Sequence, residues 1–400
     1  MLAKAAQINI GFNRFVERRQ FDRLPVDSIL LTCTLALIFI GLVMMTSASI
    51  SSADKVFNNA FYYLERQFLF VVFGLTLAYA TWKIPLSVWF SIRPILLVIG
   101  LLLLAVVLIP GVGQTVNGST RWIRFSSLNI QVSEIVKILI VIFMAGYLTK
   151  QQAFLRDSCR TAIVPIVLLF VVAGLLLMEP DFGATVVIFA TVLSMMLLAG
   201  VQLRIFIGLL GLAGTAFFVL AYSTPYRLER MSSFLDPWKD PFNSGFQLSQ
   251  SLIAFGRGEW FGVGLGESVQ KLFYLPEAHT DFVFAVIAEE LGVIGALIVI
   301  GLYTCIAWRA LKIGRACQEL GQYFAAYISF GVGSWLIFQA YVNIGVNMGV
   351  LPTKGLTLPF MSYGGSSMLM SCFALALLLR ADYELRFQYR ETKKERRAKS

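Results

Sequence analysis

The chain has 400 residues, of which 58% are hydrophobic and only 14% are charged, and its mean hydropathy is +0.75. About a quarter of the residues in soluble domains carry charge, so this composition excludes an ordinary soluble domain and indicates a protein of the lipid bilayer. The formal net charge of +10 is explained by membrane topology, and nucleic acid is not an expected partner.

Ten apolar runs along the chain are long enough to cross about 30 Å of hydrocarbon as helices. They lie at roughly 28–48, 63–82, 92–110, 132–149, 161–178, 184–200, 204–222, 282–307, 323–350 and 366–380. An even number of spans places both termini on one side, and Lys and Arg concentrate in the terminal segments and in the alternate loops on that side. By the positive-inside rule both termini are cytoplasmic. The predicted fold class is an all-α polytopic membrane protein with ten transmembrane helices.

The predicted transmembrane domain occupies the whole chain, 1–400, with a cytoplasmic N-terminal segment at 1–26 and a basic cytoplasmic tail at 381–400. The tail suits a solvated anchor beside anionic membrane lipid, with a protein-binding tail as the alternative. No cleavable signal sequence precedes the first span, so that span is expected to remain as an anchor. The five cysteines lack CxxC spacing, and neither disulfides nor a zinc site are expected.

Between the seventh and eighth spans lies one long outer loop, 223–281, and loops of this length are usually functional or disordered. Its many aromatic residues argue against a solvated linker and predict packing on the outer mouth of the bundle. No βαβ unit flanks its cluster GRGEWFGVGLG, which is interpreted as a tight loop that allows close backbone approach and not as a dinucleotide fingerprint. Two more outer segments, 111–137 and 351–367, carry polar clusters, as does the short turn EPDFG at 179–183. These segments predict one convergent outer site.

The stretch LPEAHTDF, residues 275–282, holds the only histidine of the chain and leads directly into the eighth span. At about 100° per residue, Asp281 shares a helix face with three small residues of the following turns, so its carboxylate is suited to line a cavity. The alternative is that Thr280 or Asp281 caps the helix while the small residues let a neighbouring helix pack closely. His279 is a candidate base or ligand, with a structural hydrogen-bonding role as the alternative.

Charged residues within predicted spans are costly, and they normally face a polar cavity or a partner of opposite charge. Glu289 and Glu290 lie in the eighth span, while Glu134 and Lys137 share one face of the fourth. The structural interpretation is that Lys137 pairs with Glu134, or with one of the other two carboxylates, and locks the bundle. Proton transfer is the alternative, and both stay open at this point.

The motif STRWIRF places Arg121, Trp122 and Arg124 beside the outer membrane surface. Arginine binds phosphate through two parallel hydrogen bonds, which suits recognition of a pyrophosphate at headgroup depth. An interfacial anchor made of Trp and Arg is the alternative.

Two long segments carry a family resemblance. FLDPWKDPFNSGFQLSQSLIAFGRGEWFGVGLGESVQKLFYLPEAHTDFVFAVIAEELG and NIGVNMGVLPTKGLTLPFMSYGGSS resemble the signature segments of the SEDS family of bacterial peptidoglycan glycosyltransferases. YLPEAHTDF and NMGVLPTKGLTLP resemble the cell-division members more than the elongation paralogue. The resemblance covers nearly all of the ten-span region. Glu259, Trp260 and Ala288 stand where glycine is common in the family, and none of these departures removes a catalytic group.

The resemblance implies polymerisation of lipid II, the undecaprenyl-pyrophosphate-linked disaccharide-peptide, at the outer face of the bacterial cytoplasmic (inner) membrane at the division septum. The family's essential carboxylate matches Asp281. The substrate-binding and supporting residues expected beside it are Arg121, Trp122, Lys137 and His279, and Glu134, Glu289 and Glu290. The partners implied are a class B penicillin-binding protein, which is a transpeptidase, and other proteins of the division complex.

This chemistry agrees with the residue types. The attacking sugar hydroxyl loses a proton while the leaving pyrophosphate develops charge, so one positioned carboxylate with nearby cations is sufficient. An α-linked donor and a β-linked product require one inverting displacement, in which Asp281 acts as general base and no covalent nucleophile is needed. No cofactor is required. The outer carboxylates are compatible with a divalent cation, although no ligand spacing demands one.

Two other functions were considered. A lipid II flippase also needs a polar cavity, intramembrane carboxylates and basic ligands, but it exposes them to both faces in turn, whereas the polar motifs of this chain gather on the outer side. A scaffold that only recruits a partner has no need of four charged residues within its spans. The glycosyltransferase is therefore the preferred interpretation.

Overall fold

Each of the ten apolar runs predicted from the sequence coincides with one helix of the structure. These helices are α2 (Ser28–Phe57), α3 (Tyr62–Lys83), α4 (Leu86–Val107), α5 (Val132–Lys150), α6 (Ile163–Met178), α7 (Phe182–Ala199), α8 (Leu203–Tyr222), α11 (Val283–Glu319), α12 (Tyr323–Asn347) and α13 (Gly365–Lys399). By length and composition, α2, α4, α5, α7, α11 and α12 are able to cross a membrane. The chain is therefore a predominantly helical, multi-pass membrane protein.

A computed structural model describes residues 26–116, 119–125, 128–155, 159–222, 234–243, 245–272, 274–352 and 355–399. The predicted cytoplasmic segment 1–26 lies, apart from residue 26, outside these residues, and so does the start of the predicted long loop, 223–233. The short helix η1 (Cys159–Ala162) precedes α6. The predicted basic tail continues α13 as a helix.

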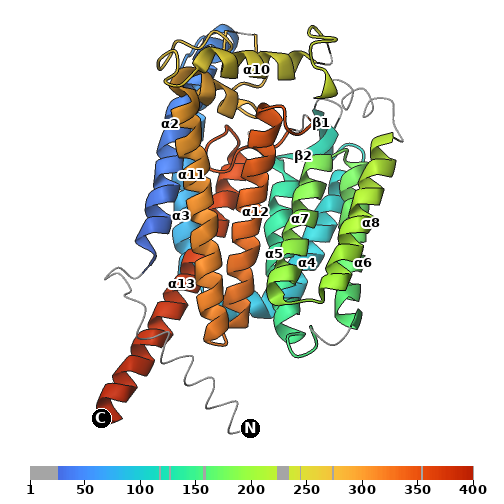
Figure 1. Ribbon diagram of the computed structural model, residues 1–400, viewed down its shortest axis with the longest axis vertical. Helices are drawn as coiled ribbons and strands as arrows, with labels where there is room; N and C mark the ends of the chain where they lie inside the picture. Colours follow the sequence, from blue (N-terminus) through green and yellow to red (C-terminus); the bar gives the residue numbers. More distant parts are fainter. Residues whose placement is uncertain are drawn as a thin grey trace.

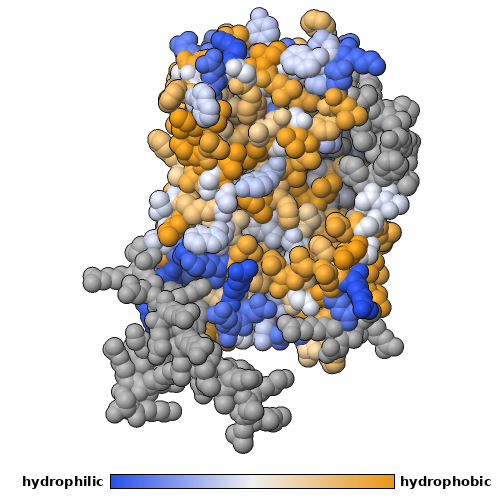
Figure 2. Space-filling model, viewed as in Figure 1, coloured by the Kyte–Doolittle hydropathy of each residue, from blue (hydrophilic) through white to orange (hydrophobic). Residues whose placement is uncertain are grey.

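The long helices run side by side along one axis, and the additional helix α10 (Phe246–Gly258) lies across the upper end of this bundle (Figure 1). In Figure 2 hydrophobic residues cover the middle of the visible face, while hydrophilic residues gather at the upper rim and toward the lower end. Asp27, at the start of α2, pairs with Arg309 of α11 and with Arg386 of α13. The beginning of α2 and the C-terminal part of α13 therefore lie at the same end of the bundle.

The predicted all-α class is wrong for one outer segment, which forms a small antiparallel sheet. Its strands are β1 (Gly113–Val116), β2 (Ser119–Phe125) and β3 (Leu128–Gln131), in that order. Trp122 in the central strand lies opposite Gln114 of β1 and Gln131 of β3. The strands escaped prediction because four to seven residues of mixed polarity give little periodicity beside long apolar runs.

The predicted helix at 282–307 is also interrupted, because Gly292 adopts φ 68° and ψ −168° inside α11. The backbone of the glycine-rich loop enters at this break. Val263 N donates to Glu289 O at 3.0 Å, and Val293 N donates to Glu259 O at 2.9 Å. A Cβ on Gly292 would lie 2.4 Å from the loop backbone, so only glycine fits. The close backbone approach expected of this cluster is confirmed.

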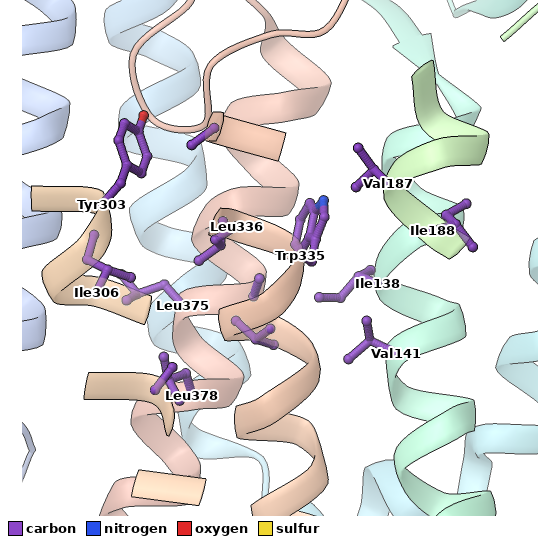
Figure 3. Packing of buried hydrophobic residues seen from close by; sticks show 14 of the residues in the cluster. Ile138, Val141, Val187, Ile188, Tyr303, Ile306, Trp335, Leu336, Leu375 and Leu378 are labelled. Atoms are coloured by element: carbon purple, nitrogen blue, oxygen red, sulfur yellow. The ribbon is translucent and has the colours of Figure 1, made fainter. Parts of the chain in front are cut away.

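Helix α12 occupies the centre of the bundle and packs against α11, α5 and α7. The side chain of Trp335 extends from α12 toward α5 and α7, where its neighbours are Ile138, Val141, Val187 and Ile188 (Figure 3). Tyr303 of α11 is also buried and donates a hydrogen bond to Pro359 O in the segment before α13. The polar residues at the outer end of α12 are thus held on a rigid, fully packed helix.

Candidate active site

The outer segments meet at one cavity of about 150 Å³, as the sequence predicts. Its walls come from β2 and β3, from the turn before α11 and from the segment that enters α13. The lining residues are Arg121, Trp122, Gln131, Glu277, Thr280, Asp281, Gly355, Thr357, Tyr363, Gly364, Ser366 and Ser367. Three of the residues named from the sequence, Asp281, Arg121 and Trp122, therefore share one cavity.

Asp281 and Arg121 lie against the same glycine. A Cβ placed on Gly355 would be 2.9 Å from Asp281 Oδ2 and 3.6 Å from Arg121 Nη2. A side chain at this position would fill the space between the carboxylate and the guanidinium group. The cavity thus places a proton acceptor and a cation around one point.

The ion pair that the Arg121 guanidinium forms with Asp181 is a long one. Arg121 Nη1 lies 3.7 Å from Asp181 Oδ1, and the same carboxylate accepts from Ser133 Oγ at 2.8 Å and from Ala184 N at 3.1 Å. Arg121 Nε and Trp122 Nε1 are buried and have no hydrogen-bond partner within the described part of the chain. Unsatisfied buried donors are costly, so these two groups are suited to an oxygen-rich ligand.

The turn between α6 and α7 contributes a second acidic residue behind Arg121. Glu179 is fully buried, and neither of its carboxylate oxygens has a hydrogen-bond partner among the described residues. Burial raises the pKa of the Glu179 carboxyl to about 8, Asp181 acts in the same direction, and Arg121 acts in the opposite one. The turn EPDFG is recognisable in the sequence as a polar cluster, but the sequence alone indicates no role for either acid.

Helix α13 begins at the cavity. Ser366 Oγ accepts from Gln131 N at 3.0 Å, which joins the helix to β3, and Thr357 Oγ1 donates to Ser367 Oγ at 2.8 Å. The first N–H groups of a helix lack partners within the helix and carry partial positive charge. This helix end therefore adds to the positive potential that Arg121 supplies.

Lys137 and Glu134 lie inside the bundle and do not line this cavity. Lys137 Nζ is 2.7 Å from Glu134 Oε1 and 2.5 Å from Gln339 Oε1, and both charged side chains are 2% exposed. Gln339 Nε2 donates to Thr357 O at 3.0 Å, so the pair reaches the cavity wall only through one amide. Of the partners considered for Lys137, the structure pairs it with Glu134.

Glu289 and Glu290 also lie away from the cavity, and each pairs with a cation of the outer loop. Arg257 Nη1 is 2.7 Å from Glu289 Oε1, and Lys271 Nζ is 2.9 Å from Glu290 Oε1. Ser47 of α2 donates to Glu290 as well. This geometry favours the structural interpretation, in which ion pairs fasten the loop to α11 and α2. Neither basic residue was named as a partner from the sequence.

His279 packs in an aromatic cluster beside the cavity. Its ring centroid lies 4.5 Å from that of Tyr63 and 5.7 Å from that of Tyr363, and the two tyrosine rings are themselves 4.9 Å apart. Its backbone oxygen accepts from Tyr363 N at 2.9 Å. Burial lowers the pKa of the His279 imidazole, against the opposing effect of Glu277, so the ring is neutral at neutral pH. The geometry gives it a packing role, and its predicted substrate contact stays a prediction.

The side chain that caps the start of α11 belongs to a residue other than Asp281. The N-cap of α11 is Phe282, which makes no side-chain capping bond, and Ala285 N donates to Asn347 Oδ1 of α12 at 3.1 Å. A neighbouring helix therefore supplies the cap, while Asp281 lines the cavity. Within the described ranges no group of three or more His, Cys, Asp or Glu side chains is placed to hold a metal ion.

Comparison with known proteins identifies the family of the chain. Residues 27–387 match the family model of the FtsW, RodA and SpoVE proteins, which is described as cell cycle protein. The chain belongs to the FtsW/RodA/SpoVE family. The matched residues therefore include all residues of the cavity and all of the helices, apart from the part of α13 after residue 387.

The chain is 55% identical to the probable peptidoglycan glycosyltransferase FtsW of Thioalkalivibrio sulfidiphilus over 350 residues, which cover 88% of each protein. It is 52% identical to the protein of the same name from Nitrosococcus halophilus, with 90% of this chain and 93% of the relative covered. Among solved structures, a chain of a peptidoglycan synthase complex that coordinates polymerization and crosslinking matches with a TM-score of 0.72 at 30% identity, covering 90% of this chain and 98% of that one. Thermus thermophilus RodA matches with a TM-score of 0.66 at 28% identity, covering 90% and 97%.

Proposed function

We propose that this family member is a peptidoglycan glycosyltransferase that polymerises lipid II at the outer face of the cytoplasmic membrane during septal cell-wall synthesis. The observation that carries the proposal is the cavity in which the Asp281 carboxylate and the Arg121 guanidinium flank Gly355. A base and a cation around one point are what a displacement at an anomeric carbon requires. The names of the FtsW relatives support the same activity.

In the proposed reaction Asp281 removes the proton from the acceptor sugar hydroxyl. The hydroxyl oxygen then forms a bond to the anomeric carbon of the donor, and the bond from that carbon to the pyrophosphate oxygen breaks. Negative charge that develops on the pyrophosphate is stabilised by the Arg121 guanidinium, the Trp122 indole N–H and the N-terminus of α13. One carboxylate suffices because the displacement is a single inverting step.

The proposed topology has ten transmembrane helices with both termini in the cytoplasm and the cavity facing outward. The shared location of Asp27 and Arg386 supports termini on one side, since α2 begins there and the C-terminal part of α13 passes there. The proposed partner is a class B penicillin-binding protein, and the similarity to a chain of a synthase complex that coordinates polymerization with crosslinking supports this pairing.

The test is polymerisation of labelled lipid II by the purified protein together with its transpeptidase partner. Asp281→Asn and wild type are compared at equal folded amounts, with Glu267→Gln, an exposed residue of the outer loop, as the control. Glycan chains from wild type and from the control, but not from Asp281→Asn, support Asp281 as the base. Chains from Asp281→Asn as well would move the base to Glu277, the other acid of the lining. If none of the three proteins makes glycan chains while lipid II binding is intact, the result would favour a flippase.

A further inference from the structure

Two asparagines of α12 hold the backbone of Asp281. Asn343 Nδ2 donates to Asp281 O at 2.8 Å, and Asn347 Nδ2 donates to the same oxygen at 3.0 Å. Both asparagines are fully buried, and their spacing of four residues places them on one face of the helix. One carbonyl oxygen, two residues before α11 begins, thus receives two side-chain donors from a neighbouring helix.

Asn347 also fixes the start of α11. Its Oδ1 accepts from Ala285 N at 3.1 Å while its Nδ2 serves the carbonyl of Asp281. One amide therefore accepts from an N–H of the first helical turn, which also donates to Phe282 O at 3.0 Å, and donates to the carbonyl that precedes the helix. Ser251 of α10 donates to Asn347 O at 2.7 Å, which anchors the asparagine from a third helix.

Asn343 connects Asp281 to the opposite wall of the cavity. Besides Asp281 O, its Nδ2 donates to Leu356 O at 2.5 Å. Leu356 follows Gly355, the residue against which the Asp281 carboxylate lies. The separation between the carboxylate and this wall is therefore set by a single amide group on a packed helix.

We propose that Asn343 and Asn347 are positioning residues that orient the carboxylate of Asp281 in the cavity, an inference that rests on the proposed role of Asp281 as general base. Asp281 precedes the helix, so the hydrogen bonds of α11 do not fix its backbone. The two amide donors do so instead. Misplacement of a reacting group by about 1 Å costs on the order of 100-fold in rate.

The chemistry of the pair supports a positioning role over simple packing. Helices that only need to approach each other use small or apolar side chains, whereas a buried amide is costly unless all of its groups find partners. Asn347 Nδ2 also contacts Asn343 O and Oδ1 within α12, and the other side-chain partners of both asparagines are backbone groups of the segments around Asp281 and Gly355. Their polar groups are therefore directed at the geometry of the cavity.

The test compares Asn343→Ser and Asn347→Asp with wild type, using the purified protein with its transpeptidase partner. Asn347→Asp keeps an acceptor for Ala285 N and loses the donor to Asp281 O. Ser329→Ala is the matched control, because it removes a buried hydrogen bond within the same helix far from the cavity. Melting temperature, kcat and KM for lipid II polymerisation are measured for each. The expected result is a fall in kcat of about 10- to 100-fold with KM within about 3-fold and melting temperatures close to that of the control.

The fall in kcat without a change in KM or folding is the result that a merely structural role would not give, and a pH profile adds a check that residue 347 lies near the Asp281 carboxyl group. The new carboxylate of Asn347→Asp lies beside Asp281 and raises its pKa, so the acidic limb of the pH–rate profile moves to higher pH. The proposal would be overturned by an unchanged kcat in the folded variants or by a change confined to KM. It would also be overturned by an unmoved acidic limb or by a loss of activity that follows the loss of folded protein. An active Asp281→Asn variant would instead refute the proposed function, and this outcome is separate because it does not involve the asparagines.

Discussion

The replacement Glu179→Gln tests the description of Glu179 as a neutral, buried acid. Its pKa of about 8 in the folded protein stands against an ordinary value of 4.5. Glutamine keeps the shape of the protonated carboxyl group and cannot ionise. Because the folded-state pKa is raised, the stabilising effect of protonation is fully present below pH 4.5 and is lost as the pH rises toward 8.

The magnitude follows from these two values. At ~1.4 kcal/mol for each pH unit, the interval between 4.5 and about 8 corresponds to ~5 kcal/mol. This figure is a ceiling, because relaxation and water entry around a buried charge reduce it. Wild type and Glu179→Gln are therefore expected to be about equally stable near pH 4.5 to 5. The advantage of the glutamine variant grows between pH 5 and 8 and levels off above pH 8.

The assay is thermal unfolding in detergent from pH 5 to 9 for wild type, Glu179→Gln and Glu267→Gln. The control removes an exposed carboxylate and is expected to give the same melting temperature difference from wild type at every pH. A pH-independent difference for Glu179→Gln would refute the neutral acid. A glutamine variant that becomes less stable than wild type at high pH would show that Glu179 is ionised and paired with Arg121.

Two further predictions concern the loop that is fastened to α11. Lys271→Met is expected to destabilise the fold by about 3–5 kcal/mol because it leaves Glu290 buried without its cation. A double variant that also carries Glu290→Gln should recover most of this loss. No recovery in thermal unfolding would contradict the pairing. Gly258→Ala is expected to lower the melting temperature, because its Cβ would lie 1.9 Å from Ala288 O, whereas Gly256→Ala in the same helix meets no atom within 4 Å and should be neutral or stabilising. Equal effects of the two alanines would contradict the close approach.

The positions of the helices were predictable because bilayer thickness sets the length of an apolar run. This signal requires no knowledge of which helices are neighbours, so all ten runs coincide with helices. The break at Gly292 was not predictable in the same way. A helix interrupted at one glycine is stable only when other backbone groups replace the lost hydrogen bonds, and here they come from a loop about 30 residues earlier in the chain. The sheet at 113–131 was missed for a related reason, since its strands are defined by their pairing.

The site was predictable where polar residues lie outside the spans. The motif STRWIRF and the stretch LPEAHTDF point to Arg121 and Asp281, which line one cavity, and the family resemblance implies the role of Asp281. Depth within a span is harder to infer: the resemblance assigns Lys137 to the pyrophosphate or to the architecture of the cavity, and the structure places it in a buried pair with Glu134 outside the cavity lining. Asn343 and the asparagine four residues later were not predicted, because uncharged polar residues are a weaker signal within an apolar span than charged ones. The spacing NIGVN carries that signal, since it places two amides on one face of an apolar helix.

The ion-pair distances in the bundle distinguish cations with a close carboxylate partner from Arg121, which is suited to bind a ligand. Among the cations in close pairs are Lys137, Arg257 and Lys271, each of which has a carboxylate oxygen at 2.7 to 2.9 Å. Arg121 lies 3.7 Å from Asp181, whose oxygens already accept hydrogen bonds from a serine hydroxyl and a backbone N–H. A close partner cancels most of a cation's potential, whereas a distant and shared one leaves much of it for a second anion. The wider separation at Arg121 is therefore the electrostatic reason to place the leaving pyrophosphate there and not at Lys137.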